Sequence, residues 1–247
     1  MYSTLKLIGK RFLPHNFISK NEKSLRRFVA SFYAGDDFQC NICEYKLSKF
    51  IENKIGELIC PNCGSLRRTR RLHKLIFSLE NLPNLKILHF SPPKPLEEKL
   101  SALLGDRYIT TDFELEFRAK KRLDITQIDE PNSSYDLIIC YHVLEHIEDD
   151  RKAMKELNRI LRKNGIIFIQ TPYQKGPIFE EPSIKTSEER ALKYGQKDHV
   201  RIYSVEGLNE RLQESGFETE ILEFSEIPTN SNGFKEKEWV IKAKNSQ

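Results

Sequence analysis

The sequence has no apolar run long enough to cross a membrane and no strong excess of charge of one sign. A bilayer-spanning helix needs about 20 mostly apolar residues, and no window approaches that length. Residues 1–17 are basic, but their apolar stretches are too short and broken for a secretory signal. The net charge of +4 permits an anionic partner without requiring one. We therefore expect a cytoplasmic protein without a membrane span.

Cysteine is scarce, but four of the five cysteines form two Cys-x-x-Cys pairs. The pairs are Cys40 with Cys43 and Cys60 with Cys63. Each pair can direct two thiolates at one tetrahedral ion, and in a reducing compartment such pairs favour metal binding over disulfides. We predict a structural zinc site, because four sulfur ligands leave no open position for chemistry. Four unrelated cysteines, or a redox pair, are the alternatives.

A basic run from Arg67 to Lys74 follows the second pair of cysteines. Leu72, Leu75, Ile76 and Leu79 follow at helical spacing, so the basic side chains would partly form the outer face of a helix. One interpretation is the solvated start of this helix. The other is a phosphate-facing surface for nucleic acid or a nucleotide-linked substrate. Before the cysteines, residues 24–33 predict an amphipathic helix, which we expect to pack against the cysteine module rather than to bind a membrane.

Strand and helix patterns alternate from Leu85 onward, which is the signature of a doubly wound parallel sheet. A short apolar run bounded by turn residues suits a strand buried on both faces. Such strands are expected at residues 85–90, 108–111, 122–125, 137–141 and 166–169. Two further β-rich segments, 217–224 and 238–244, predict an antiparallel pair at the sheet edge, joined through the loop 228–233. Residues 174–200 form a long polar insertion that could cover a site.

Titratable residues stand where these predicted strands end. Asp112 and Asp124 close the second and third strands, and His142 follows the apolar run that ends at Tyr141. Ligands of open α/β sheets bind beyond the carboxyl ends of the strands. An acid about twenty residues past the first strand is where nucleoside-binding folds place a carboxylate on ribose hydroxyls. These positions predict a ligand site at this edge.

The region from Leu85 to Lys244 resembles the class I S-adenosylmethionine-dependent methyltransferases of the small-molecule type. The resemblance is carried by Tyr135-Asp136-Leu137-Ile138-Ile139-Cys140 with His142-Val143-Leu144-Glu145-His146, by Glu156-Leu157-x-Arg159-Ile160-Leu161-x-x-x-Gly165, by Asp198-His199-Val200-Arg201-x-Tyr203 and by Gly216-Phe217. The cysteine pairs with Gly64-Ser65-Leu66-Arg67-Arg68 resemble a zinc-ribbon-like segment that precedes such domains in some members.

The resemblance implies an α/β fold, a Rossmann-like doubly wound seven-stranded sheet with a C-terminal antiparallel hairpin. The chain would then comprise a helical segment at 1–39, a zinc-ribbon-like module with a basic helix at 40–80, and a methyltransferase domain at 81–247. The implied cofactor is S-adenosylmethionine. Carried over by position, Asp112 would bind the ribose hydroxyls and Asp124 with Ile125 would flank the adenine. Cys140, Tyr141 and His142 would line the pocket near the methionine part.

One departure from the family concerns the turn after the first strand. The family has an acid and several glycines there, whereas this chain has His89-Phe90-Ser91-Pro92-Pro93-Lys94. Phe90 and Ser91 would occupy the cofactor-binding turn. Either the chain belongs to a subfamily with a different turn, or cofactor binding is impaired. We favour the first, because the later motifs and both Asp residues persist.

Methyl transfer needs a base only if the acceptor must lose a proton. The candidates are His142, His146 and His199, with Glu145 as base or orienting group. Glu145 and His146 could instead cap the next helix. We expect catalytic roles for His142 as a pocket residue and for His199 as an acceptor-side residue, while Tyr173 and Tyr203 could shape the acceptor pocket.

Three functions are compatible with these residues. The first is methyl transfer to a small-molecule or sugar-derived acceptor. The second is RNA methylation, with the zinc module and Arg67 to Lys74 binding the RNA. The third is a cofactor-free binding scaffold that keeps only the fold.

Overall fold

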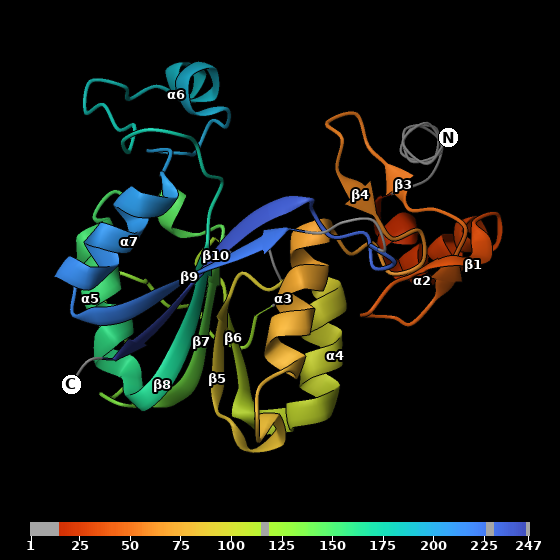
Figure 1. Ribbon diagram of the computed structural model, residues 1–247, viewed down its shortest axis with the longest axis horizontal. Coiled ribbons are helices and arrows are strands. Elements are labelled where there is room, and N and C mark those ends of the chain that lie inside the picture. Colours follow the sequence, from red (N-terminus) through yellow and green to blue (C-terminus); the bar gives the residue numbers. More distant parts are fainter. Residues whose placement is uncertain (1–14, 115–118, 226–229, 246–247) are drawn as a thin grey trace. The chain divides into compact units, whose positions relative to one another are not determined.

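The computed structural model describes residues 15–114, 119–225 and 230–245, with side chains from residue 21 onward. The chain forms two compact units, and Figure 1 labels their helices and strands. The first unit comprises Met1–Leu82, Pro93–Lys99 and Ser225–Lys237. The second comprises Pro83–Pro92, Leu100–Phe224 and Glu238–Gln247. The basic N-terminal stretch and part of the loop expected at 228–233 lie outside the described residues.

The second unit contains a sheet in the order β6-β5-β7-β8-β10-β9. Its strands are β5 (Ile87–Phe90), β6 (Tyr108–Thr111), β7 (Tyr135–Tyr141), β8 (Leu161–Gln170), β9 (Phe217–Ser225) and β10 (Lys237–Asn245). β5 is parallel to β6 and β7, β7 is parallel to β8, and β10 is antiparallel to β8. The α/β class, the doubly wound order and the antiparallel C-terminal strands are confirmed.

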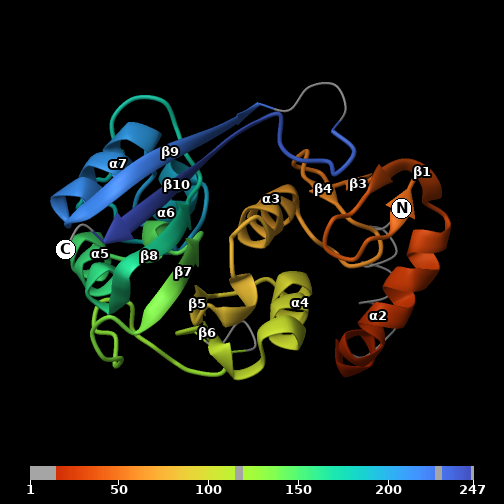
Figure 2. The ribbon, with the colours of Figure 1, turned by 60° about the horizontal axis from the view of Figure 1, so that its bottom comes forward.

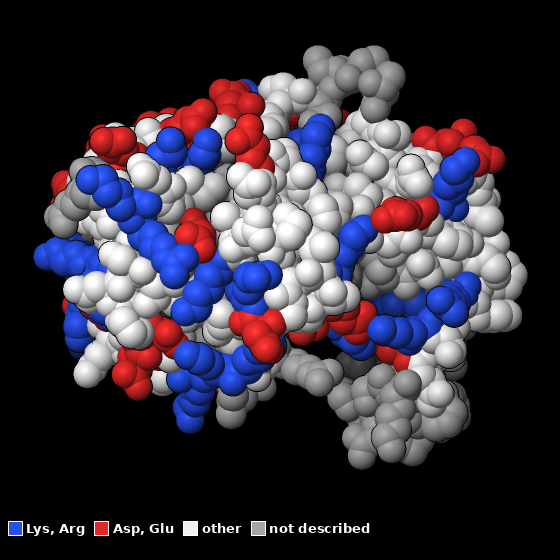
Figure 3. Space-filling model, turned by 90° about the horizontal axis from the view of Figure 1, so that it is seen from below, with Lys and Arg blue, Asp and Glu red and all other residues white. Residues whose placement is uncertain are grey.

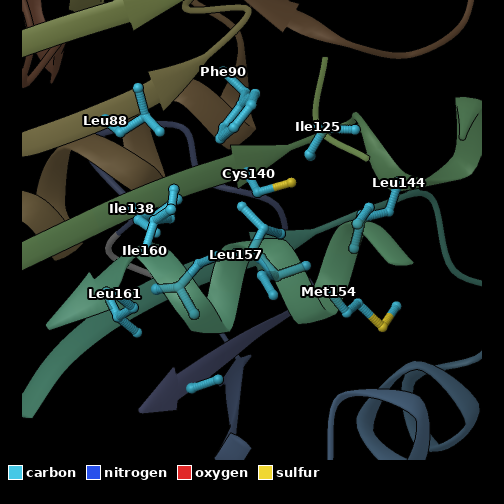
Figure 4. Close-up of a cluster of buried hydrophobic side chains, with 14 of the residues drawn as sticks. Leu88, Phe90, Ile125, Ile138, Cys140, Leu144, Met154, Leu157, Ile160 and Leu161 are labelled. Carbon is cyan, nitrogen blue, oxygen red and sulfur yellow. The ribbon is translucent and has the colours of Figure 1, made fainter. Parts of the chain in front are cut away.

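The core of this unit is built from the buried strands and from the apolar faces of two helices. α5 (Asp150–Ile160) and α7 (Val205–Glu214) cover one face of the sheet (Figure 1), and their buried residues join those of the strands in one cluster. Figure 4 shows Met154, Leu157 and Ile160 of α5 beside the side chains of β5 and β7. Burying a side chain of this size contributes roughly 1.5–3 kcal/mol. Because β7 is central, its residues are buried on both faces.

The short strand expected at residues 122–125 does not form. Only isolated bridges occur there, Thr111 with Lys121 and Asp124 with Gln127, so the sheet has six strands in the described part of the chain rather than seven. The reason is local: Asp124 Oδ1 accepts hydrogen bonds of 2.8 Å from both the backbone N–H and the hydroxyl of Thr126. This turn competes with a strand.

The insertion at 174–200 contains a helix that the polar composition did not predict. α6 (Ser187–Tyr194) begins with a capping box in which Thr186 and Glu189 exchange side-chain and backbone hydrogen bonds. It ends at Gly195, whose φ of 84° is the left-handed conformation favoured at helix ends.

The first unit is small and rests on its own apolar cluster. It contains α2 (His15–Ser31), β1 (Ala34–Gln39), β2 (Lys46–Leu47), β3 (Ile51–Glu52), β4 (Leu58–Ile59) and α3 (Arg67–Phe77). Figure 2 shows α2 with β1, β3 and β4. The first residues of α4 (Lys94–Leu104) belong to this unit, where Lys99 Nζ donates to Ile42 O at 2.9 Å. No helix in the described part of the chain is both long and apolar enough to span a membrane.

The basic run from Arg67 to Lys74 forms α3, but two of its arginines are buried, which neither interpretation of the sequence anticipated. The guanidinium of Arg70 donates to the carbonyls of Ser65 and Gly233 at 2.7 and 2.6 Å and lies 4.1 Å from the centre of the Phe50 ring. Arg71, 1% exposed, stacks on Phe234. These side chains hold the first unit together and do not face a phosphate backbone.

Candidate functional site

Ser91 and Asp112 meet at the carboxyl ends of two neighbouring parallel strands. Because Phe90 of β5 is in register with Thr111 of β6, the residues that follow them lie side by side. Ser91 Oγ donates to Asp112 Oδ1 at 2.7 Å, and Ser91 N donates to Thr111 O at 2.8 Å. Ser91 has a φ of 47°, the left-handed region that glycine usually supplies. The glycine-free turn therefore makes a turn of the kind for which glycine is normally selected.

Three of the residues expected at the cofactor have side chains in the core instead. Phe90, Ile125 and Cys140 are at most 4% exposed and pack in the cluster of Figure 4. Burial raises the pKa of the Cys140 thiol, with the charge of Glu145 as a further cause, so Cys140 stays a neutral thiol. Only the backbone of these residues is free to line a pocket. Asp124 is exposed, and its carboxylate is engaged in its own turn.

The end of β7 directs a group of titratable side chains to the same edge of the sheet. Tyr141 is the last residue of β7, and His142 follows it with a φ of 55° while its N–H donates to Gln170 O of β8 at 2.8 Å. Glu145 and His146 then lie in the short 3-10 helix η3 (Leu144–His146). The next helix, α5, is capped by Asp149, which accepts from Lys152 N at 3.0 Å. The hypothesis that Glu145 and His146 cap this helix is therefore wrong.

His199 joins this group from a distant part of the chain. Glu145, His146 and His199 each offer a ligand atom, and these atoms lie within 4.8 Å of one another; we call the three residues the histidine cluster. The rings of His146 and His199 meet edge to face at 4.7 Å. His142 Nδ1 lies 3.2 Å from Glu145 Oε1, and His146 Nδ1 lies 3.1 Å from Asp198 Oδ2. Burial lowers the pKa of His199, which favours its neutral form.

Backbone hydrogen bonds hold the two segments of the cluster together. Val200 N donates to Glu145 O at 2.9 Å. The guanidinium of Arg201, 5% exposed, donates to the carbonyls of Leu144, Ile147 and Glu148. Because Arg201 satisfies carbonyls around the 3-10 helix, it fixes the backbone that carries Glu145 and His146.

The two tyrosines considered for an acceptor pocket differ in their surroundings. Tyr203 is fully buried and donates to the carboxylate of Asp150, so it has a structural role. Tyr173 has a buried hydroxyl without a hydrogen-bond partner among the described residues, and burial raises its pKa, with Glu145 as the next cause. Tyr173 is therefore the tyrosine with an unused polar group beside the histidine cluster.

The four paired cysteines converge in the first unit. Cys40 Sγ lies 3.7 Å from Cys63 Sγ, and Cys43 Sγ lies 3.7 Å from Cys60 Sγ. Tetrahedral coordination with Zn–S bonds of about 2.3 Å separates the sulfurs by about 3.8 Å. The two Cys-x-x-Cys turns also share one backbone pattern, since Glu44 N donates to Cys40 O and Gly64 N donates to Cys60 O. The donor set and its spacing fit a zinc ion.

A separate hollow of about 380 Å³ lies away from this edge. Its lining includes Asn132 and Ser133, which precede β7, and Lys155 and Arg159 of α5. It is therefore on the side of the amino ends of the parallel strands, opposite to Ser91, Asp112 and His142.

Comparison with known proteins identifies the class. The family described as "Methyltransferase domain" matches residues 63–221, which is more than half of the chain. The chain belongs to this family, and its second unit is a class I S-adenosylmethionine-dependent methyltransferase domain.

Individual relatives are distant. An S-adenosylmethionine-dependent methyltransferase from Mesorhizobium loti shares the fold with a TM-score of 0.52 at 14% identity, over 71% of this chain and 97% of that one. One from Archaeoglobus fulgidus gives 0.51 at 16% identity, over 72% and 93%. A protein named ajmaline N-methyltransferase, from Rauvolfia serpentina, is 30% identical over 63 residues, 26% of this chain. The chain thus spans about a fifth, 22%, of that relative.

Proposed function

We propose that this protein transfers the methyl group of S-adenosylmethionine to a small-molecule acceptor. The observation that carries the proposal is the contact between Ser91 and Asp112 at the carboxyl ends of β5 and β6. It supports an intact cofactor site despite the glycine-free turn, because the left-handed Ser91 lets the chain reverse where the family has glycine. This argues against an impaired site or a cofactor-free scaffold.

The residues at this edge fit the cofactor. Asp112 would bind the ribose hydroxyls through its carboxylate, with Ser91 holding Oδ1 in place. The backbone of Cys140 and Tyr141 and the side chain of His142 would border the methionine part. Asp124 and the backbone of Ile125 would stand beside the adenine, since the Ile125 side chain is buried in the apolar cluster.

The chain's own residues act mainly by positioning the acceptor. S-adenosylmethionine supplies a methyl group that is already activated for an in-line displacement. His142, whose Nδ1 lies 3.2 Å from Glu145 Oε1, accepts the acceptor's proton where one must be removed. His199, a member of the histidine cluster, would contact the acceptor.

Calorimetric titration with S-adenosylmethionine tests the cofactor site. We expect saturable binding to the wild-type chain and binding at least about tenfold weaker for Asp112→Asn, because the loss of one charged acceptor removes roughly 1.5–3 kcal/mol. Asp106→Asn is the matched control, since Asp106 is exposed in the nearby 3-10 helix η2 (Gly105–Arg107). No binding to the wild type, or equal affinity for both variants, would contradict the proposal.

A small-molecule acceptor is favoured over RNA by the arginines of α3. Arg70 and Arg71 are committed to contacts inside the first unit, which removes half of the four arginines that an RNA-binding surface would use. Figure 3 shows one face of the molecule on which Lys and Arg are interspersed with Asp and Glu. The similarity to a protein named for N-methylation of ajmaline also supports a small acceptor.

The zinc proposal concerns the first unit. We propose that Cys40, Cys43, Cys60 and Cys63 bind one structural Zn²⁺. Ser65 supports this site from outside the sulfur shell, since its hydroxyl lies 3.3 Å from Cys40 Sγ and 3.2 Å from Cys63 Sγ.

A further inference from the structure

The histidine cluster contains a buried carboxylate that the protein itself does not satisfy. Glu145 is 1% exposed, and neither of its carboxylate oxygens has a hydrogen-bond partner among the described residues. His142 Nδ1 lies 3.2 Å from Oε1, but without hydrogen-bonding geometry. A buried carboxylate without hydrogen bonds is strongly destabilising unless a cation compensates it.

Two imidazoles converge on this carboxylate. The ligand atoms of Glu145, His146 and His199 lie within 4.8 Å of one another, and the two rings stand at 88°, edge to face. Two imidazoles and one carboxylate are a ligand set typical of zinc and non-haem iron sites.

Asp198 completes the arrangement from outside. Its Oδ2 lies 3.1 Å from His146 Nδ1. With its proton on Nδ1, beside this carboxylate, His146 would offer the lone pair of Nε2 to a metal ion. Carboxylate–histidine pairs of this kind orient the imidazole ligands of metal ions.

The backbone presets this geometry without an ion. Val200 N donates to Glu145 O, so the residue after His199 is tied to the residue that supplies the carboxylate. Arg201 fixes the carbonyls of Leu144, Ile147 and Glu148 on both sides of the pair Glu145-His146. Preorganised ligands lose little conformational entropy on binding, which favours affinity.

We infer that Glu145, His146 and His199 bind a divalent transition-metal cation at the edge of the sheet beyond β7. Three protein ligands leave coordination positions open. The side chains of His142 and His146 are 25% and 31% exposed, so the site is reached from solvent. This step rests on the proposed methyl transfer: the open positions would be available to an oxygen or nitrogen of the acceptor. The ion would polarise that atom, and His199 would serve the reaction as a ligand of the ion.

Mn²⁺ is the probe that separates this site from the cysteines, because it prefers oxygen and nitrogen ligands to thiolates. The full chain is titrated with Mn²⁺ without S-adenosylmethionine, and free Mn²⁺ is followed by electron paramagnetic resonance. We expect one bound Mn²⁺ per chain, and binding at least about tenfold weaker for Glu145→Gln and for His199→Gln. Glu148→Gln, the same change three residues along the chain at an exposed position, should bind as the wild type does.

Water-proton relaxation measured on the same samples tests the open positions. Bound Mn²⁺ that keeps water ligands enhances the relaxation, whereas a fully enclosed ion does not. Wild-type protein without bound Mn²⁺, or equal affinity in the Glu145→Gln and Glu148→Gln variants, would overturn the inference.

Calorimetry with S-adenosylmethionine on each variant shows whether it is folded and distinguishes failure of this inference from failure of the proposed function. Cofactor binding without Mn²⁺ binding defeats only the metal site. Mn²⁺ binding without cofactor binding defeats only the methyltransferase proposal.

Discussion

At the scale of single residues, Ser91 shows how a side chain can take over a position where glycine is usual. Its φ of 47° is unfavourable for a residue with a β-carbon, but its hydroxyl donates to Asp112 at 2.7 Å. The hydrogen bond offsets part of the backbone strain and also orients the carboxylate. With serine in place of glycine, the turn is strained, but the Asp112 carboxylate is held in a fixed orientation.

Two substitutions at Ser91 should therefore rank in an unusual order. Ser91→Ala keeps the strained backbone and loses the hydrogen bond, whereas Ser91→Gly loses the bond but relieves the strain. We expect the glycine variant to be more stable than the alanine variant by about 1 kcal/mol, measured by urea denaturation. Ser101, inside the helix α4, is the control position, where glycine should be less stable than alanine. The same order at both positions would contradict the assigned strain.

His89 predicts a pH dependence of stability. It is fully buried in β5, its Nδ1 lies 2.8 Å from the hydroxyl of Tyr108, and burial lowers its pKa to about 3. In the unfolded chain the imidazole takes up a proton below about pH 6.5, while the folded chain keeps it neutral. The unfolded state therefore binds more protons, and stability falls as the pH drops from 6.5 towards 3, by roughly 1.4 kcal/mol per pH unit.

The variant His89→Gln should flatten this dependence, because an amide can bond to Tyr108 without titrating. The measurement is urea denaturation at a series of pH values between 4 and 7. Part of the slope should remain in the variant, since burial also lowers the pKa of His73, to about 4. A slope unchanged from the wild type would show that His89 is not the titrating group.

At the scale of secondary-structure elements, β7, α5 and β8 form a parallel βαβ unit, in which β8 begins at Leu161 directly after the helix ends at Ile160. The start of α5 is the less obvious boundary. Three acidic residues precede or begin it, yet only Asp149 accepts from the backbone of the first turn, while Asp150 is buried and pairs with Arg211 at 2.6 Å.

Asp149→Ala should therefore destabilise the chain by about 1 kcal/mol through loss of the helix cap. Asp149→Ser keeps an oxygen that can accept from Lys152 N and should recover most of that stability. Urea denaturation of the two variants measures the difference. Equal stability of the two variants would show that the Asp149 side chain does not stabilise α5 as a helix cap.

The strength of the local apolar pattern decides which elements could be predicted from the sequence. Strands β5 to β8 and the edge pair β9 and β10 have strong apolar patterns and were predicted. The strand at 122–125 was not formed, because the turn made by Asp124 prevails over a weak pattern. The sequence also placed Glu145 and His199 only as separate candidates, since a tertiary hydrogen bond between Val200 and Glu145 brings them together. The only hint of this convergence in the sequence is that an acidic residue directly precedes a histidine in both segments, at Glu145-His146 and at Asp198-His199.

At the scale of the whole molecule, the chain combines two units that have different sources of stability. The second unit has a large apolar cluster of its own. The first has a small cluster in which two of the buried residues are themselves cysteines of the proposed zinc site. A module with so small a core depends on its metal for folding. Loss of the ion should therefore affect the two units unequally.

A cysteine-to-serine substitution in each unit tests whether the two units respond independently. Cys60→Ser should abolish zinc binding, measured as zinc per chain, and unfold the first unit, while S-adenosylmethionine binding by the second unit remains. Cys140→Ser should leave the zinc content near one per chain, but destabilise the second unit by about 1–3 kcal/mol, because it buries a hydroxyl in the apolar cluster around Leu157. Limited proteolysis shows which unit opens in each variant. Zinc content unchanged in Cys60→Ser, or lost in Cys140→Ser, would contradict the assignment of the four paired cysteines.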